Sequence, residues 1–232
     1  MPDIILKSNN IVKSYKNSEN VSLQVLRGIN LEIVENKISV IIGASGAGKS
    51  TLLHLLSGLD RPDSGEVIFD NRNIYSLNDN KLAQFRNNTL GFVFQFHHLL
   101  NEFTAAENVA IPLLIKGVSL KSAMKRAEEL LDSVGLKDRL THKPAELSGG
   151  EQQRISVARA LANNPSIIFA DEPTGNLDSA NGKIINDIFL ELRDKYNKTF
   201  IIVTHNAELV KLADYVYEIK DGIIIDNNEP II

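Results

Sequence analysis

Residues 43–50 read Gly43-Ala44-Ser45-Gly46-Ala47-Gly48-Lys49-Ser50 and match the pattern G-x-x-x-x-G-K-[ST] at every position. The run before them, residues 37–42, is mainly apolar, which is typical of a buried strand that stops at a turn. The apolar residues after them share one helical face: Leu52, Leu55, Leu56 and Leu59. Gly58 is placed to end that helix. The sequence therefore predicts a strand, a glycine-rich loop and a helix, the arrangement that cradles phosphate groups.

The side chains at the end of this loop suit a nucleoside triphosphate with Mg²⁺. Lys49 can reach the β- and γ-phosphates, the Ser50 hydroxyl can bind Mg²⁺, and Thr51 adds a further donor. A glycine-rich turn could match the pattern by chance, but the buried strand before it and the amphipathic helix after it favour the functional interpretation. We expect the nucleotide to contact the whole segment: Gly43, Ala44, Ser45, Gly46, Ala47, Gly48, Lys49, Ser50 and Thr51.

Two acidic residues, Asp171 and Glu172, close the apolar run 167–170. Carboxylates at the carboxyl end of a strand lie at the edge where open α/β sheets bind ligands. Asp171 is suited to hold Mg²⁺ through water, and Glu172 to polarise the attacking water. The alternative is a pair of solvated acids ahead of Pro173, which is improbable beside a complete phosphate loop.

The stretch Leu147-Ser148-Gly149-Gly150-Glu151-Gln152-Gln153 contains a capping box, because Ser148 is followed three residues later by Glu151. A helix N-terminus with two glycines is also a second anion site in the same chain. One nucleotide does not need two such sites, so the sequence hints at a site shared between two molecules. The similar stretch 104–107 lacks glycines, and we interpret it as a structural cap.

The totals exclude several classes of protein. The chain has 232 residues, 43% of them apolar, so it can bury a sizeable core. Its net charge of −4 argues against a nucleic-acid binder, and without cysteine it has no disulfides. No apolar run approaches the roughly 18 residues of a membrane helix, and residues 1–4 lack the basic region of a signal peptide. We expect membrane contact only through partners.

Strand-like and helical segments alternate along the chain, which predicts an α/β fold with a mostly parallel sheet. Residues 29–33 alternate between apolar and polar, the period of a half-buried strand. The mainly helical stretch 96–162 interrupts this alternation as an insertion. We therefore expect one domain over residues 1–232, with a core formed by 1–95 and 163–232 and a helical subdomain at 96–162. Residues 214–225 resemble a hairpin.

These motifs together resemble the ATP-binding-cassette (ABC) transporter ATPases, over nearly the whole chain. The resemblance implies a P-loop NTPase core, an N-terminal antiparallel β part and an inserted helical subdomain, with ATP and Mg²⁺ as cofactors. Leu147–Gln153 is similar to the ABC signature, which closes over the ATP held by the other subunit of a homodimer. By resemblance, Ser148, Gly149 and Gly150 contact the opposing γ-phosphate.

The resemblance also implies roles for four further residues. Gln95 matches the glutamine that reaches Mg²⁺ and water and senses the permease, and His205 matches the histidine that contacts the γ-phosphate. Asp178 lies in Asn176-Leu177-Asp178, which matches the loop that crosses the dimer interface. Tyr15 matches the aromatic residue that stacks on adenine. The implied catalytic residues are Glu172, His205, Lys49 and Gln95, and the implied Mg²⁺ residues are Ser50, Gln95 and Asp171.

Residues 94–104 and 107–115 resemble the LolD subfamily, the ATPases of lipoprotein-releasing systems, although Asn101 stands where a proline is common. This implies integral permease partners of the LolC/LolE kind and a peripheral place at the cytoplasmic face of the inner membrane. MacB-like export and FtsE-like control of cell-wall cleavage remain as alternatives. A non-transport ABC ATPase is disfavoured by the single cassette and the negative charge, and a GTPase by the lack of an N-K-x-D motif.

The pair His97-His98 raises the question of a metal site. Adjacent residues on a helix do not face one another, and no cysteine or third histidine lies nearby, so we reject this interpretation. The apolar residues of 96–103 suit either a groove for a partner helix or ordinary burial within the helical insertion.

Overall fold

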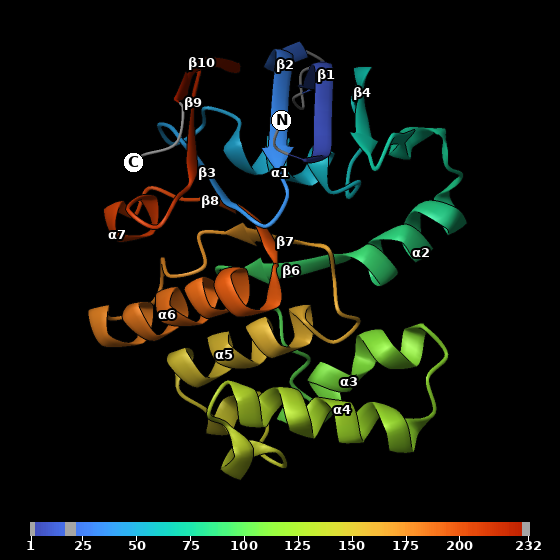
Figure 1. The fold of residues 1–232 in the computed structure, drawn as a ribbon, viewed down its shortest axis with the longest axis vertical. Helices are drawn as coiled ribbons and strands as arrows, with labels where there is room; N and C mark the ends of the chain where they lie inside the picture. The colour runs from blue at the N-terminus through green and yellow to red at the C-terminus, as the bar shows by residue number, and fades with distance from the viewer. Residues whose placement is uncertain (1–2, 17–21, 229–232) are drawn as a thin grey trace.

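The computed structural model describes residues 3–16 and 22–228 (Figure 1). Its strands are β1 (Ile4–Lys16), β2 (Ser22–Val34), β3 (Ile38–Ile42), β4 (Ser64–Phe69), β5 (Arg72–Asn73), β6 (Leu90–Phe94), β7 (Ile167–Asp171), β8 (Thr199–Val203), β9 (Tyr215–Lys220) and β10 (Ile223–Asn228). Its α-helices are α1 (Lys49–Leu56), α2 (Asp79–Thr89), α3 (Ala105–Ile115), α4 (Leu120–Ser133), α5 (Gly149–Ala160), α6 (Ser179–Tyr196) and α7 (Ala207–Val210).

The strands form two sheets. The larger has the order β10-β9-β3-β8-β7-β6, and all its pairs are parallel except the β9–β10 hairpin. The smaller has the order β2-β1-β4-β5 and is antiparallel. This confirms the expected α/β class, the mostly parallel sheet, the antiparallel N-terminal part and the C-terminal hairpin.

Helix α1 lies between the two sheets (Figure 1), and apolar side chains from all three share one core cluster. Strand β2 behaves as its alternation predicted, because Ile29, Leu31 and Ile33 are buried while Asn30 and Glu32 are exposed. Strands β3, β7 and β8 are buried on both faces, which explains why their sequences are continuously apolar rather than alternating.

The prediction for α1 was wrong at one residue. Leu52, Leu55 and Leu56 are buried as expected, but Leu59 is 44% exposed. The helix ends at Leu56, and Gly58 then takes a φ of +69°, which turns the chain away from the helical path. Leu59 therefore leaves the face that its spacing predicted.

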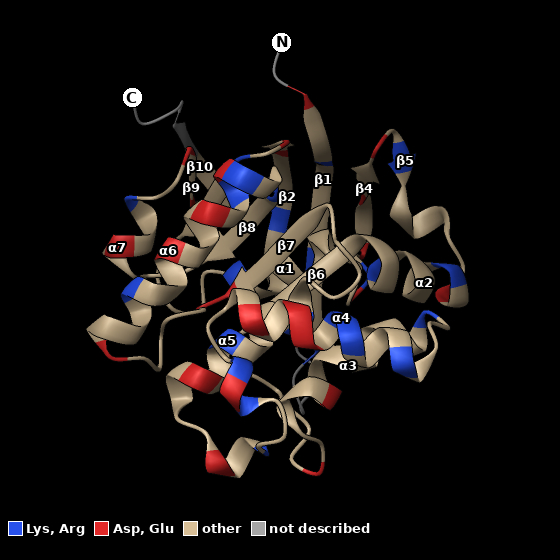
Figure 2. Ribbon diagram, turned by 60° about the horizontal axis from the view of Figure 1, so that its bottom comes forward, with Lys and Arg blue, Asp and Glu red and all other residues tan. Residues whose placement is uncertain are grey.

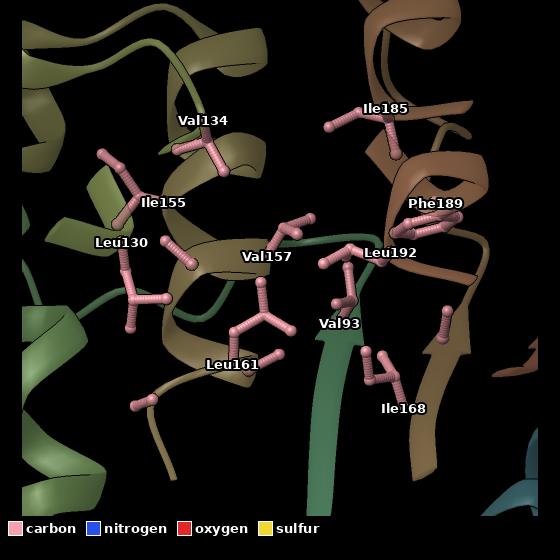
Figure 3. Packing of buried hydrophobic residues seen from close by; sticks show 14 of the residues in the cluster. Val93, Leu130, Val134, Ile155, Val157, Leu161, Ile168, Ile185, Phe189 and Leu192 are labelled. Carbon is pink, nitrogen blue, oxygen red and sulfur yellow. The ribbon is translucent and has the colours of Figure 1, made fainter. Parts of the chain in front are cut away.

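Helices α3, α4 and α5 are inserted between β6 and β7, which pair directly with each other. In Figure 3, Val157 of α5 and Leu161, which directly follows this helix, lie between Leu130 of α4 on one side and Leu192 of α6 on the other. All belong to one cluster that also contains residues of β3, β6, β7 and β8. Helix α5, the signature helix because it begins within the stretch 147–153, is therefore packed against both the other inserted helices and the large sheet.

Helix α4 is held by packing rather than by its charges. Its buried face consists of Ala123, Ala127, Leu130 and Leu131, which recur at helical spacing. Its basic residues gather in the first half of the helix and its acidic residues in the second (Figure 2). This order is unfavourable to the helix dipole, so burial of the apolar face has to supply the stability.

The segment after β6 is not a helix. We rejected a metal at His97-His98 by treating these two residues as helical, and that premise was wrong. Both histidines have positive φ, +39° and +49°, and helix α3 begins only at Ala105. The Arg159 guanidinium holds this turn by donating to the carbonyls of His97 and His98 at 2.6 and 2.7 Å. Thr104 and Glu107 form the predicted structural cap of α3. Within the described ranges, no helix is both long and apolar enough to cross a membrane.

Candidate active site

Several of the predicted site residues follow neighbouring parallel strands. Phe94 pairs with Asp171, Asp171 with Val203, and Val203 with Ile41. The residues just beyond these positions are therefore brought to one edge of the large sheet. This is the edge where open parallel sheets bind ligands.

The phosphate loop joins β3 to α1 through two glycines that accept no larger side chain. A Cβ on Gly43 would lie 2.3 Å from the carbonyl oxygen of Ile219, and Gly48 caps α1 with a φ of +104°. Lys49 curls back over the loop, and its Nζ donates to the carbonyls of Gly43 at 2.9 Å and Ala44 at 3.0 Å. The ammonium therefore stands at the mouth of the loop.

A cleft of about 300 Å³ brings this loop and the two acids together. Its lining consists of Val25, Ser45, Gly46, Gly48, Lys49, Ser50, Thr51, Asp171, Glu172 and Val203. The residues of 43–51 and the end of β7, more than a hundred positions apart in sequence, thus form one site.

Ser50 and Asp171 supply paired oxygen atoms to the cleft. Ser50 Oγ lies 3.3 Å from Asp171 Oδ1. Burial raises the pKa of Asp171, while the Ser50 hydroxyl opposes this rise. Hydroxyl and carboxylate oxygens are the donors that Mg²⁺ prefers, and a cation would offset the cost of burying the carboxylate. The donor set fits the ion that the sequence predicted.

Glu172 is oriented by the end of the next strand. Its backbone has a φ of +45°, which turns the side chain beyond β7. Its Oε2 accepts a hydrogen bond from the Thr204 hydroxyl at 2.9 Å and one from the backbone N–H of His205 at 3.3 Å. His205 Nδ1 lies 2.6 Å from Oε1. Glu172 is mostly buried while His205 is exposed, so the carboxylate is fixed and the imidazole remains accessible.

Gln95 follows β6 as predicted but is turned toward another loop. Its Nε2 donates to Asn176 Oδ1 at 3.1 Å, and Asn176 Nδ2 donates to the Gln95 carbonyl at 3.2 Å. Gln95 is not among the described residues that line the cleft. In this structure it is therefore not brought into the cleft beside Ser50 and Asp171.

Tyr15 lies on β1 beside the N-terminal half of α1. Its hydroxyl donates to Asp60 Oδ2 at 2.9 Å, and Lys13 Nζ lies 5.0 Å from the ring centroid. The pKa of Tyr15 is raised, first by partial burial and then by Asp60, while the Thr51 hydroxyl acts in the opposite direction. Tyr15 as a residue is 41% exposed, so it is accessible for stacking.

The signature residues and Asp178 lie apart from the described lining of this cleft. Ser148 caps α5 and forms the predicted capping box with Glu151. The Ser148 N–H and the Arg139 guanidinium hold the pKa of Glu151 down at about 2. Asp178 caps α6 and accepts from the Asn181 backbone and side-chain nitrogens at 2.8 and 2.9 Å. Ser148, Gly149 and Asp178 are exposed, so a second molecule could reach them.

Comparison with known proteins agrees with this architecture. The sequence profile of the ABC transporter family matches residues 26–175. The chain belongs to the ABC transporter family. The matched range runs from β2 through the phosphate loop and the signature helix to the residues that follow Glu172, so it contains both motifs described above.

Curated relatives of this ABC cassette are similar along nearly their whole length. The lipoprotein-releasing system ATP-binding protein LolD of Cytophaga hutchinsonii is 51% identical over 95% of this chain and 99% of its own. LolD of Bacteroides fragilis is 52% identical over 88% of this chain and 94% of its own. The cassette is thus an ABC ATP-binding subunit of the LolD type.

Solved structures share its fold. The dimeric ATP-binding cassette MJ0796, in a post-hydrolysis state bound to ADP and Pi, superposes with a TM-score of 0.89 at 40% identity, covering 97% of this chain and 98% of the other. CbiO1 of Clostridium perfringens, part of the transporter complex cbiONQ, has a TM-score of 0.85 at 28% identity, covering 98% and 89%.

Sequence reasoning missed several residues that support the site of the cassette. Thr204 is fully buried and orients Glu172, and its position between an apolar strand and His205 was the available signal. Asp60 and Lys13 hold Tyr15 but carry no motif. Gln153 was quoted only as part of the signature, and nothing in its spacing indicated that its amide reaches Pro173.

Proposed function

We propose that the chain hydrolyses ATP as the nucleotide-binding subunit of a transporter that releases lipoproteins from a membrane. The observation that carries this proposal is the single cleft in which Lys49, Ser50, Asp171 and Glu172 meet. Hydrolysis of a triphosphate is promoted by positive charge at the phosphates and by a carboxylate at the attacking water. In the cleft, Lys49 supplies positive charge, Ser50 and Asp171 would hold Mg²⁺, and Glu172 is the carboxylate. We infer lipoproteins as the cargo from the relatives named above. They are ATP-binding proteins of lipoprotein-releasing systems, and their sequences are 51% and 52% identical to this one.

Binding of ATP replaces contacts that the loop now makes with itself. Phosphate oxygens take the place of the Gly43 and Ala44 carbonyls at Lys49 Nζ, because a charged acceptor forms the stronger hydrogen bond. Backbone N–H groups of 43–51 and the N-terminus of α1 complete the cradle. Ser50 and Asp171 would hold Mg²⁺, and Gln95 would be a further ligand once its side chain is free of Asn176. When bound, Mg²⁺ neutralises charge on the phosphates.

Glu172 orients and polarises the attacking water. Two donors, the Thr204 hydroxyl and the His205 N–H, fix its Oε2, so the carboxylate loses little freedom when a water molecule binds. His205 Nδ1 is engaged by Oε1, which leaves Nε2 free to face the γ-phosphate. Tyr15 stacks on adenine, and its bond to Asp60 keeps the ring in position.

Two copies of the chain complete each nucleotide site. The first turn of a helix leaves its N–H groups unbonded, and the capping box satisfies only those of Ser148 and Glu151. The N–H groups of the exposed Gly149 and the buried Gly150 have no acceptor among the described residues, and we assign them to an anion, the γ-phosphate held by the other copy. Asp178, exposed at the start of α6, belongs to the same interface. Support comes from MJ0796, whose structures are dimeric.

A groove between α2, β6, α3 and α5 receives an integral permease subunit of the LolC/LolE kind. The groove has a volume of about 410 Å³, and its lining includes Phe92, Phe94, Pro112 and Ile115. Ile115 is 70% exposed, and Phe96, which follows the lining residue Phe94 by two positions, is 69% exposed. An apolar helix from the partner would cover them. The chain would then sit at the cytoplasmic face of the inner membrane through its partners alone.

The groove lies where the two expected parts of the chain meet. We propose residues 96–162 as a helical subdomain and residues 1–95 and 163–232 as the nucleotide-binding core. The groove is lined from both, because α2 and β6 precede residue 96 whereas α3 and α5 follow it.

Isolation of the chain from membranes tests the proposal. We expect it to co-purify with integral permease subunits and to hydrolyse ATP faster in that complex than alone. Ile115→Asp should lose the permease, because it buries a charge in an apolar contact. Ile223→Asp, at an exposed isoleucine of β10 outside the groove, is the matched control and should retain it. Equal recovery of permease with both variants would contradict the docking site.

A further inference from the structure

Gln153 connects the signature helix to the catalytic loop. It lies on α5 and is only 1% exposed. Its Nε2 donates to the carbonyl of Pro173 at 2.5 Å. Pro173 directly follows Glu172, so this hydrogen bond joins the helix that begins at Ser148 to the loop that carries the catalytic carboxylate.

A second contact joins the same two parts of the chain. A Cβ on Gly150 would lie 2.1 Å from Asn181 Oδ1, so the Asn181 side chain fills the space beside this glycine. Asn181 is bonded in turn to Asp178. The first turns of α5 therefore touch both ends of the segment 172–181, at Pro173 and at Asn181.

Packing alone does not explain a glutamine at position 153. Its Oε1 is buried and has no hydrogen-bond partner among the described residues, and a buried acceptor without a partner is destabilising. An apolar side chain of similar size would avoid this cost. Helix α5 is already held by Ile155, Val157 and Leu161 (Figure 3). What the amide adds is the directed bond to Pro173.

We propose that Gln153 is a positioning residue that transmits the position of the Glu172 loop to the signature turn of the same chain. This inference rests on the proposed function, in which that turn serves the nucleotide held by the other subunit. Gln153 and Ser148 lie five residues apart at one end of a rigid helix, so a shift at Pro173 moves the turn with it. The catalytic loop of one site thereby sets the geometry of the other.

The test compares ATP hydrolysis by the full-length wild type and Gln153→Met, which keeps the size of the side chain but cannot donate. We expect kcat to fall about tenfold, because the loss of one hydrogen bond that holds the catalytic loop in place corresponds to about one factor of ten in rate. The KM for ATP should change less than about twofold, and cooperativity with respect to ATP should disappear. The thermal midpoint should change little, because removal of the unpaired Oε1 offsets the Pro173 carbonyl that loses its donor.

Ser156→Ala is the matched control. Ser156 is also buried on α5, and its hydroxyl likewise has no partner among the described residues, but it makes no bond to the catalytic loop. It should keep the wild-type kcat and cooperativity. Asn181→Ala is a second, partly exposed test position, where we expect cooperativity to weaken even if Gln153→Met does not fold.

Two results would overturn the inference while leaving the proposed function intact. One is a folded Gln153→Met with wild-type kcat and cooperativity, or, if that variant does not fold, an Asn181→Ala with unchanged cooperativity. The other is a wild type that hydrolyses ATP without any cooperativity. A wild type that does not hydrolyse ATP at all would instead contradict the proposed function.

Discussion

His205 Nδ1 lies 2.6 Å from Glu172 Oε1, at the ends of two adjacent parallel strands. The pairing of Asp171 with Val203 fixes this contact, because Glu172 directly follows Asp171 and His205 lies two positions after Val203. Glu172 adopts a φ of +45° to make it, a conformation that costs a non-glycine residue about 1–3 kcal/mol. Such strain is typical of a functional site.

Glu172→Gln should therefore separate binding from hydrolysis. The amide keeps the shape of the side chain but cannot polarise water, so we expect turnover to fall at least about 100-fold while ATP still binds. Since hydrolysis no longer reopens the dimer, a dimer should accumulate with ATP and be visible by sedimentation velocity. A monomer that hydrolyses ATP at the normal rate would refute the role of Glu172.

Lys49→Ala should abolish tight ATP binding. Lys49 is the only lysine in the described lining of the cleft. Loss of its ammonium group leaves the phosphates without their strongest direct donor. Isothermal titration with ATP measures the effect. Lys211→Ala, which removes an exposed lysine paired with Glu208, is the control and should bind normally. Near-normal affinity of Lys49→Ala would count against the phosphate-loop assignment.

Tyr15→Ala should weaken nucleotide binding by about 1–3 kcal/mol, the range for stacking of a base on an aromatic ring. Tyr15→Phe keeps the ring and removes only the hydrogen bond to Asp60, so it should lose much less. Fluorescent nucleotide titration distinguishes the two. Unchanged affinity in Tyr15→Ala would remove this residue from the site.

The capping box predicts a pH dependence of stability. The pKa of Glu151 is lowered from an ordinary value of 4.5 to about 2, first by the Ser148 N–H and then by Arg139. A lowered pKa means that this carboxylate stabilises the fold above about pH 4.5 and loses its effect as the pH falls toward 2. Glu151→Gln keeps the shape of the cap and lacks the charge.

Urea unfolding of both proteins measures this contribution. Above pH 4.5 the wild type should exceed Glu151→Gln in unfolding free energy by up to about 1 kcal/mol, the upper end of the usual range for a negative charge at a helix N-terminus. The difference should shrink as the pH approaches 2. A difference that stays constant or grows on acidification would contradict the ionised cap.

Local patterns predicted the elements of this fold well, because each pattern has a direct physical cause. The Ser148 capping box, the alternation of Ile29, Leu31 and Ile33, and the glycine-rich loop were all visible within a few residues. Leu59 was placed wrongly, because spacing alone does not locate the end of a helix. The turn at His97-His98 was missed because its positive φ values depend on Arg159, about sixty residues away.

The sequence could indicate a shared location for Ser50, Asp171 and Glu172, which line one cleft, because Ser50 closes the phosphate-loop pattern and the two acids stand at the end of an apolar run. Their catalytic roles stay predictions. The bond from Gln153 to Pro173 and that from Tyr15 to Asp60 join segments whose pairing the sequence does not state. The predicted grouping of Gln95 with the Mg²⁺ residues stays a prediction, since here it bonds to Asn176.

Crosslinking between subunits tests the shared nucleotide site most directly. The chain has no cysteine, so Ser45→Cys and Ser148→Cys can be introduced into Glu172→Gln as its only thiols. With ATP and Mg²⁺, a short bifunctional thiol reagent should join the loop of one chain to the signature turn of another, and without nucleotide it should not. Full nucleotide binding by a monomer, with no crosslink between chains, would contradict the account.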